Sequence, residues 1–561
     1  MTGSPRFPHS RAPTWRRLAI VVLAAASCKL APPSNSHGST GQGGTAAGSG
    51  GSGGSKSGGS GGSAGQSGGS HSGAGSVGSG GLAASGGSTA INGSGGAGGT
   101  ASSSGGGGAG GTSGSGGTSG SGGTSGGGGT SGGGATAGSG GASSAVEARD
   151  ASVPDVAVDT APSRGPAQST TGHKFPFPQN RESSRCVYPA GYRNEDVQAA
   201  YAQWKSDNVT STGAKNYLRV QRPNEPGGNL QKGSTVSEGI GYGMLIAVYM
   251  DDQNLFDNLW MYEQQFLDGT TGLMNWYISA DGSGPGTAAD GTSGSGPATD
   301  ADEDMAFALI MADKQWGGQL AMAGKNYIDI AKGQLTKVWD NEIFNYIYLK
   351  PGAWGDNTTI NLSYFAPAYY KLFATVDTAN ATNWTNVVNT MYTVLNASLN
   401  SSNGNSSNGL VPAWCNSNGQ PNGGAFGPGK TAPTNYQYDS CRTPFRIGLD
   451  YCWNGETRAK NYVANTSSFF SGIGATNMVD GYALNGNAQA QYQTGSTQSS
   501  AFVGPAGVGA MSNSNYQGFV NDAYGVLITG KALVGGTYYD DSWMVMSLLM
   551  MTANFLDYTA Y

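Results

Sequence analysis

The stretch Ala298-Thr-Asp300-Ala-Asp302-Glu-Asp304-Met-Ala-Phe-Ala-Leu-Ile-Met-Ala-Asp-Lys-Gln-Trp316 places acidic residues first and apolar residues after them. The apolar residues recur at i, i+4, i+7 and i+11, the spacing of one buried helix face: Met305, Leu309, Ala312 and Trp316. Thr299 or Asp300 is expected to cap this helix. The acids of its first turn suit the positive end of the helix dipole. Capping does not explain the Gly-Ser-Gly-Pro segment at 294–297, which precedes the acidic stretch. Its small residues lead a carboxylate to the N-terminal end of the helix. The stretch therefore predicts a helix whose N-terminus is a candidate site for acid–base chemistry.

The N-terminal third of the chain has a different composition. A large share of the 97 glycines lies between residues 41 and 141, in Gly/Ser/Thr-rich sequence that has almost nothing to bury. Such sequence is typical of disordered linkers. We therefore expect a signal peptide at 1–28, a disordered linker at 29–169 and one folded domain at 170–561.

Charge and histidine content exclude several classes of function. A net charge of −6 with 11% charged residues provides no basic surface for nucleic acid. Only one histidine falls in the foldable segment, at its edge; the four are His9, His37, His71 and His173. A Ser-His-Asp triad, a Cys-His pair or a histidine-ligated metal is therefore not expected in the domain, and we predict no metal and no cofactor. Carboxylates are the leading acid–base candidates.

The N-terminus is typical of an export signal. Arginines at 11, 16 and 17 precede an apolar run at 18–26 that is too short to remain as a membrane span. Two cleavage patterns compete: Ala24-Ala-Ala26 fits a small-residue site, and the sequence ending in Cys28 fits a lipoprotein signal. We favour the lipoprotein, because a lone Cys28 directly after the apolar run has no other evident use. The protein is thus expected to be exported, as a cell-surface lipoprotein or in secreted form.

Helical patterns dominate the foldable segment. We expect helices at 195–206, 236–250, 255–267, 302–313, 320–339, 365–374, 382–399, 443–453, 457–470, 516–527 and 541–556. Long Gly/Asn/Ser loops join them, and no convincing β-alternation is present. The apolar run at 543–551 predicts a fully buried helix. An all-α array of paired helices, closed into a toroid or bundle, is the expected architecture.

Four cysteines lie in the foldable segment: Cys186, Cys415, Cys441 and Cys452. An exported protein permits disulfides, and an even number suits them. A helix over eleven residues would place Cys441 and Cys452 about 16 Å apart, beyond bridging range. A bond from Cys415 to Cys441 or to Cys452 and four free buried thiols remain as alternatives.

Two further clusters carry acids at the N-terminal ends of predicted helices. In Ser237-Glu-Gly-Ile-Gly-Tyr-Gly, three alternate glycines allow a ligand or a second backbone to approach Glu238 closely. In Tyr438-Asp-Ser-Cys-Arg442, Asp439 lies just before a helix that Pro444 favours. Arg442 and Arg446 are near enough in sequence to keep Asp439 ionised, as a general base requires. Structural capping or ion pairing would equally explain these acids.

Together these motifs resemble glycoside hydrolase family 8. The stretch 298–316 matches that family's nineteen-residue signature at every position, and the clusters around Glu238 and Asp439 lie before and after it, in the right order. The resemblance covers about residues 180–561 and implies an (α/α)6 barrel that hydrolyses β-1,4-linked glycans with inversion. It implies that Glu238 is the proton donor, that Asp300 binds and distorts the sugar, and that Asp439 is the general base.

Sugar faces stack on aromatic rings, so aromatic residues in or beside loops are candidate subsites. The substrate-binding candidates are Trp276, Trp354, Tyr364, Tyr369, Trp414 and Tyr438, together with Arg442. Trp276 leads, because the loop around it resembles a subsite loop of the family. We expect a monomeric endo-β-1,4-glucanase acting on polysaccharide. The alternatives are a xylanase, a chitosanase, and a non-catalytic carbohydrate-binding protein of the cell surface.

Overall fold

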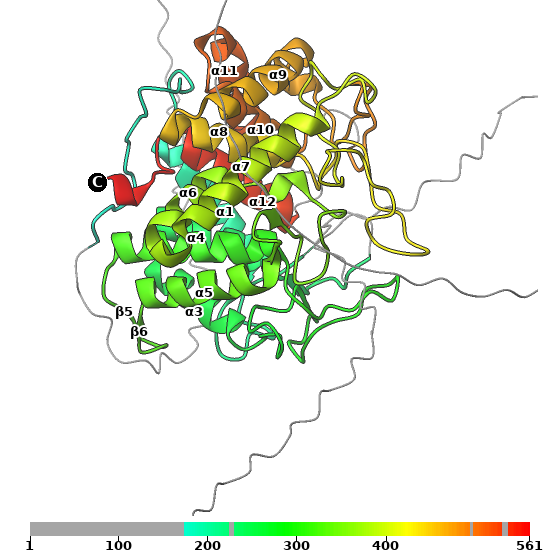
Figure 1. Cartoon of the computed structure of the whole chain (residues 1–561). Coiled ribbons are helices and arrows are strands. Elements are labelled where there is room, and N and C mark those ends of the chain that lie inside the picture. The colour runs from blue at the N-terminus through cyan, green and yellow to red at the C-terminus, as the bar shows by residue number, and fades with distance from the viewer. Residues whose placement is uncertain (1–172, 224–228, 494–497, 530–536) are drawn as a thin grey trace, which may run out of the picture. The chain divides into compact units, whose positions relative to one another are not determined.

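A computed structural model describes residues 173–223, 229–493, 498–529 and 537–561 (Figure 1). The predicted signal peptide and the whole of the predicted linker lie outside these residues. Twelve α-helices of the described part form two layers, in which inner and outer helices alternate along the chain. The inner helices are α2 (Ser237–Tyr249), α4 (Thr299–Gln315), α6 (Pro367–Val376), α8 (Thr443–Asn454), α10 (Ser500–Ala510) and α12 (Tyr538–Met551). The outer helices are α1 (Asn194–Asn208), α3 (Gln253–Glu263), α5 (Tyr327–Glu342), α7 (Ala381–Ser398), α9 (Thr457–Ile473) and α11 (Gln517–Ile528).

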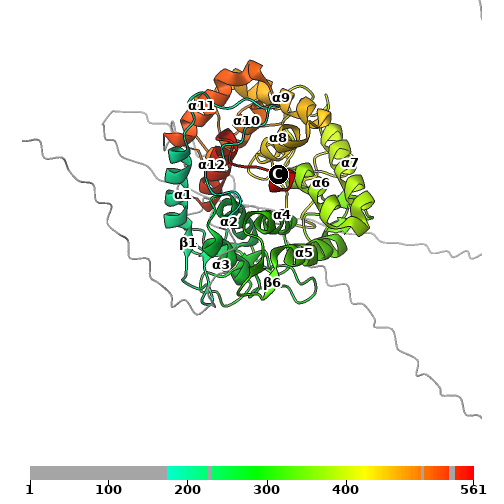
Figure 2. The same ribbon diagram turned by 90° about the vertical axis from the view of Figure 1, so that its left-hand side faces the viewer.

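The inner helices close into a ring. Each contacts the next inner helix along the chain, and α12 packs back against α2. Outer helices pack on this ring, α1 on α12, α3 on α2, α5 on α4, α7 on α6, α9 on α8 and α11 on α10, as Figure 2 shows. The predicted (α/α)6 barrel is therefore confirmed.

Sequence composition separates the two layers. Every residue of α2, α10 and α12 is buried, because these helices are enclosed by neighbours on all sides. The buried apolar run at 543–551 is thus confirmed. The outer helix α1 instead buries one stripe, made of Val197, Ala200, Trp204 and Asn208. None of the helices in the described part is long and apolar enough to cross a bilayer.

Helix α10 was not predicted, because its sequence breaks the usual rules. Its residues include glycines at 504, 507 and 509 and Pro505, all unfavourable inside a helix. Packing explains two of the glycines. A β-carbon on Gly504 would lie 2.3 Å from the Ser547 hydroxyl oxygen, and one on Gly507 would lie 2.4 Å from Cε of Met551. The glycines therefore let α10 approach α12 closely, and tertiary contact overrides helix propensity.

The described residues also form short two-stranded antiparallel sheets. They pair β1 (Val209–Thr210) with β2 (Arg219–Val220), β3 (Thr235–Val236) with β4 (Tyr277–Ile278), β5 (Gln319–Leu320) with β6 (Lys325–Asn326), and β7 (Ile343–Phe344) with β8 (Tyr348–Leu349). The β5–β6 hairpin occupies the first residues of the helix predicted at 320–339, so α5 begins later, at Tyr327. Short 3-10 turns complete the secondary structure: η1 (Leu362–Tyr364), η2 (Thr378–Asn380), η3 (Ala475–Asn477), η4 (Ser514–Tyr516) and η5 (Tyr558–Ala560).

The cysteine pairing differs from the predicted alternatives. A disulfide joins Cys186 to Cys452, with 5.6 Å between their Cα atoms, while Cys415 and Cys441 are free and buried. A bond between Cys415 and either Cys441 or Cys452 is therefore wrong. The expectation that Cys441 and Cys452 do not pair is confirmed, since α8 separates them. The bond spans 266 residues and ties the segment before α1 to the C-terminal end of α8, a contact that sequence spacing does not reveal.

Candidate active site

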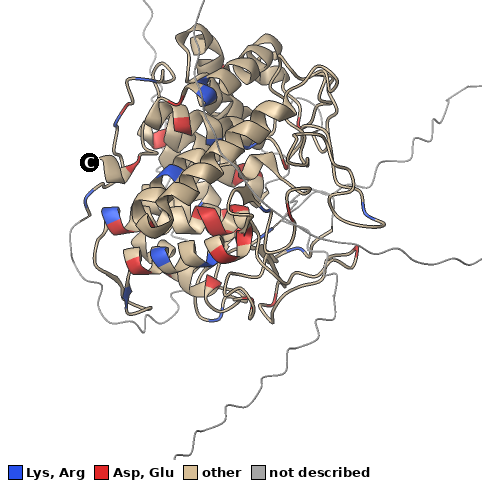
Figure 3. Cartoon of the chain, in the orientation of Figure 1, with Lys and Arg blue, Asp and Glu red and all other residues tan. Residues whose placement is uncertain are grey.

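The N-terminal ends of the inner helices carry the predicted acids. Glu238 is the second residue of α2, Asp300 is the second residue of α4, and Asp439 lies four residues before α8 begins. Figure 3 shows acidic residues concentrated at the N-terminal end of α4. Helix α4 begins at Thr299 after Ala298, without a side-chain cap, so neither Thr299 nor Asp300 is the predicted cap. Asp300 is therefore left for other contacts, in a position where the helix dipole favours its charge.

Arg442 joins two of these acids, Glu238 and Asp300. Its Nη1 donates to Oε2 of Glu238 and to Oδ2 of Asp300, both at 2.6 Å, and to the hydroxyl of Tyr242 at 3.0 Å. Its Nε donates to the hydroxyl of Ser363 at 3.0 Å. All these side chains are buried, so one guanidinium charge bridges two carboxyl groups in an environment of low polarity.

Glu238 is held in a setting that favours its neutral form. The other carboxyl oxygen, Oε1, accepts a hydrogen bond of 2.6 Å from the hydroxyl of Tyr538, the first residue of α12. Complete burial raises the pKa of Glu238 well above its usual value, and the charge of Asp300 adds to this shift, whereas Arg442 and the hydrogen bond from Tyr538 oppose it. A carboxylic acid with a raised pKa is the group that can donate a proton near neutral pH.

The glycines that follow Glu238 admit other parts of the protein. A β-carbon on Gly239 would lie 3.2 Å from the ring of Tyr538, and one on Gly241 would lie 3.2 Å from the carbonyl oxygen of Ala301. The close approach expected from these glycines is therefore made by α12 and by the backbone of α4. It brings Tyr538 and Asp300 within reach of the Glu238 carboxyl group.

Asp439 has a different environment from the one predicted. Its Oδ2 accepts hydrogen bonds from Nε1 of Trp414 at 3.1 Å and from Nε2 of Gln437 at 3.0 Å. Arg442 and Arg446, which were expected to keep Asp439 ionised, bind other acids. Arg442 binds Glu238 and Asp300, and Arg446 forms a two-pronged pair with Asp304 and contacts Glu303 at 3.0 Å. The two neutral donors favour the charged form of Asp439, since each donates to its carboxylate.

Three of the aromatic candidates group around these acids. Trp414 packs near Trp354 and Tyr364, with ring centroids 6.2 and 6.5 Å apart, and the Tyr364 ring lies 4.9 Å from the Arg442 guanidinium. Trp354 is only half-buried. The loop of Trp276 lies beside the site, because the Trp276 carbonyl accepts from the backbone N–H of Ser237, the residue before Glu238.

Two other candidates lie in the interior. Tyr369 lies inside α6, where its ring stacks on Phe307 with centroids 3.8 Å apart, so it packs in the barrel core. Tyr438 is buried, and its hydroxyl donates to the carboxylate of Asp480 at 3.0 Å. Neither side chain presents a free face on which a sugar ring would stack.

A second group of buried acids, which comes from α3, α4 and α5, was not predicted. Burial raises the pKa of Asp302, of Glu263 to about 7, and of Glu342 to about 8. The charge of Glu342 raises the pKa of Asp302 further. In the described ranges, no group of three or more His, Cys, Asp or Glu residues is arranged to hold a metal ion.

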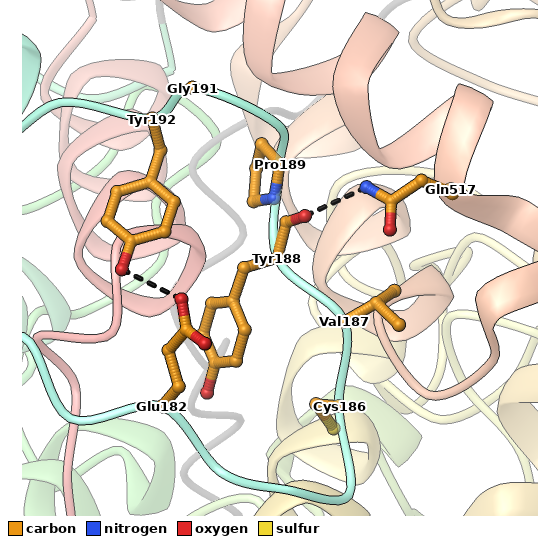
Figure 4. A pocket seen from close by; sticks show the side chains of 8 residues that line it. All are labelled: Glu182, Cys186, Val187, Tyr188, Pro189, Gly191, Tyr192 and Gln517. Carbon is orange, nitrogen blue, oxygen red and sulfur yellow. Dashed lines mark hydrogen bonds between the residues drawn. The ribbon is translucent and has the colours of Figure 1, made fainter.

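A surface depression lies apart from these acids. It is lined by the segment before α1 and by the first residue of α11, with Tyr192 donating to Glu182 and Gln517 donating to the carbonyl of Tyr188 (Figure 4). Cys186 also lines it, and its disulfide places the depression near the C-terminal end of α8. Asp439 precedes the other end of that twelve-residue helix, roughly 18 Å away along the axis.

Known proteins resemble this chain in sequence and in fold. The family model described as "Glycosyl hydrolases family 8" matches residues 183–553. "Endoglucanase 2" of Ruminiclostridium josui is 36% identical over 405 residues, which cover 70% of this chain and 80% of that protein. The structure of a β-1,3-1,4-glucanase from Paenibacillus sp. X4 aligns with a TM-score of 0.59 and 29% identity, covering 68% of this chain and 99% of the other. A cold-adapted family 8 xylanase shares the fold, with a TM-score of 0.53 and 22% identity over 68% of this chain and 98% of the other.

Proposed function

Because the chain belongs to glycosyl hydrolase family 8, we propose that Glu238 and Asp439 hydrolyse β-1,4-linked glucan at internal bonds. The endoglucanase of R. josui supports glucan as the substrate, and so does the β-1,3-1,4-glucanase structure, since both named activities are on glucans. The protein is a glycoside hydrolase of the endoglucanase type. The single observation that carries the assignment is the buried Glu238 carboxyl group held between Arg442, Asp300 and Tyr538.

Charge balance explains how Glu238 works as the acid. With Glu238 protonated, the positive Arg442 offsets the negative Asp300, so the buried group is neutral as a whole. When Glu238 gives its proton to the leaving glycosidic oxygen, Arg442 and the Tyr538 hydroxyl are already in place to stabilise the new carboxylate. No side chain has to move for this compensation, which lowers the barrier to proton transfer.

Asp439 takes the complementary role. It accepts a proton from the attacking water, and the donors Trp414 and Gln437 keep it in the charged form that a base needs. Attack of this water on the face opposite to the leaving group breaks the C–O bond, and the proton from Glu238 completes the departing hydroxyl. We propose inversion of the anomeric carbon on this basis. Trp354 is the proposed sugar platform, because Trp276 is as deeply buried as Tyr369 and Tyr438.

Reducing-sugar release tests the proposal. Wild type is incubated in parallel with carboxymethyl cellulose, lichenan, xylan and chitosan, beside Glu238→Gln and the matched control Glu195→Gln on the exposed face of α1. We expect the fastest release from one of the glucans, loss of nearly all activity in Glu238→Gln, and no change in the control. Faster release from xylan would instead identify a xylanase, and faster release from chitosan a chitosanase. Full activity of Glu238→Gln would remove Glu238 as the acid.

We also propose that the protein is exported and anchored through a lipid on Cys28. The Cys186–Cys452 disulfide supports export, since such bonds persist in oxidising compartments. The lipoprotein pattern that ends at Cys28 supports the anchor. Detergent-free release of a Cys28→Ser variant should exceed that of wild type, and equal release would contradict the anchor. On the same basis, residues 29–169 would be a tether between the anchor and the catalytic domain.

A further inference from the structure

The connection between α9 and α10 contains a buried carboxylate that gathers four donors. Oδ1 of Asp480 accepts from the backbone N–H of Gln491 at 2.6 Å. Its Oδ2 accepts from the backbone N–H groups of Tyr492 at 2.6 Å and Gln493 at 2.9 Å, and from the hydroxyl of Tyr438 at 3.0 Å. Asp480 is fully buried, so these bonds are made in an environment of low polarity.

This connection is also joined to the segment that carries Asp439. The backbone N–H of Tyr436 donates to the carbonyl of Tyr482 at 2.9 Å, and the N–H of Tyr482 donates back to the carbonyl of Tyr436 at 2.8 Å. Asp480 and Tyr438 lie two residues away from this bridge, on either side of it. Main-chain pairing and the Asp480–Tyr438 bond therefore hold the two connections as one unit.

Tyr438 is fixed at each end. Its ring packs edge-on against Phe502, with centroids 5.1 Å apart, and its carbonyl oxygen accepts from the hydroxyl of Tyr539 at 2.9 Å. The hydroxyl end is held by Asp480. Since Tyr438 is bonded directly to Asp439, any rotation of its backbone would turn the Asp439 carboxylate away from the water it activates.

We propose that Asp480 is a positioning residue for the general base, acting on Asp439 through Tyr438. This inference rests on the proposed function of Asp439. The four partners are all donors, and a carboxylate is the side chain that accepts from all of them without offering a donor of its own. An amide in its place would turn an N–H group toward one or more of these donors and leave them unpaired. The chemistry of the site therefore selects an acid at 480.

The experiment compares Asp480→Asn, Tyr438→Phe and their combination in the full-length protein, with Asp522→Asn on the exposed face of α11 as a matched control. We expect kcat on soluble glucan to fall about 10- to 100-fold in Asp480→Asn, with KM within about twofold, because misplacing a catalytic group by a fraction of an ångström has effects of this size. Tyr438→Phe should show a smaller fall in kcat. The double variant should match Asp480→Asn, since both changes break the same link.

Two readouts separate positioning from loss of fold. The acidic limb of kcat/KM against pH reports the base, so it should shift in Asp480→Asn, whereas partial unfolding would lower the whole profile equally. Tyr438→Phe keeps the carboxylate and its main-chain bonds, so it tests the link even if Asp480→Asn fails to fold. Unchanged kcat, additive losses in the double variant, or an unshifted pH limb would overturn the inference. If Asp439→Asn retained activity, the proposed function itself would fail; if only the Asp480 and Tyr438 variants stayed fully active, the positioning role alone would fail.

Discussion

Replacing Glu342 with glutamine should remove a measurable part of the pH dependence of stability. Glu342 is the last residue of α5 and is fully buried beside the first turn of α4, where Thr299 and Asp302 are its polar partners. Burial raises its pKa from 4.5 to about 8. Glutamine has nearly the same shape and keeps hydrogen-bonding capacity toward both partners, but it carries no ionisable proton.

The direction in which stability changes with pH follows from the raised pKa of Glu342. A carboxyl group whose folded pKa is raised adds stability below its unfolded pKa, and this stability is lost as pH rises toward the folded pKa. Between pH 5 and pH 7.5 the folded protein holds a proton on Glu342 that the unfolded chain has released. At about 1.36 kcal/mol per pH unit, this window corresponds to about 3 kcal/mol. For a domain of roughly 390 residues, the unfolding entropy converts that energy to about 4 °C in Tm.

Thermal unfolding of the full-length protein at pH 5 and at pH 7.5 provides the measurement. As the pH rises, the Tm of wild type should fall by about 4 °C more than the Tm of Glu342→Gln. The variant should be the more stable of the two at pH 7.5. Glu195→Gln on the surface serves as the control and should follow wild type. An equal pH slope in wild type and Glu342→Gln would refute the reasoning, and so would a wild-type Tm that rises with pH more than the variant's.

Three other outcomes are expected. Early proton NMR of the hydrolysate should show the α-anomer first, if Asp439 activates water across from Glu238; a first-formed β-anomer would exclude inversion. Replacing both Cys186 and Cys452 with serine should lower the free energy of unfolding by about 2–5 kcal/mol and leave kcat on soluble substrate unchanged, because the bond lies at the far end of α8; a large loss of kcat at a temperature where the variant is folded would contradict this. Deleting residues 41–141 should not alter activity on soluble substrate, and a large loss would assign that segment to the catalytic domain.

The helices were largely predictable from the sequence, because burial of one face leaves a period that local residues report. The exception, α10, shows the limit of this approach. Its glycines are selected by contacts with Ser547 and Met551 on α12, and no local pattern signals a partner about forty residues further on. The late start of α5 has a similar origin, since a hairpin pairs residues that also fit a helical period.

The sequence motifs located the acids of the site at the correct helix ends, but they did not identify the residues that bind these acids. Arg442 was expected to serve Asp439, its near neighbour in sequence, and it binds Glu238 and Asp300 instead. Proximity along the chain did not reveal these partners, because they lie on α2 and α4, more than a hundred residues away in sequence. The pairing of Cys186 with Cys452 and the role of Asp480 depend on contacts between segments that only the closed barrel brings together, so sequence reasoning could not find them.

The closure of the ring has a consequence for protein synthesis. Tyr538, which binds the Glu238 carboxyl group, is 300 residues further along the chain, on the helix that completes the barrel. A ribosome that has already released α2, α4 and α8 has therefore not yet supplied the hydroxyl that donates to Glu238. A nascent chain therefore lacks one hydrogen-bond partner of the proposed acid until the last helix emerges. A stop codon before α12 would leave a product with most of the sequence of an enzyme and, we expect, none of its turnover.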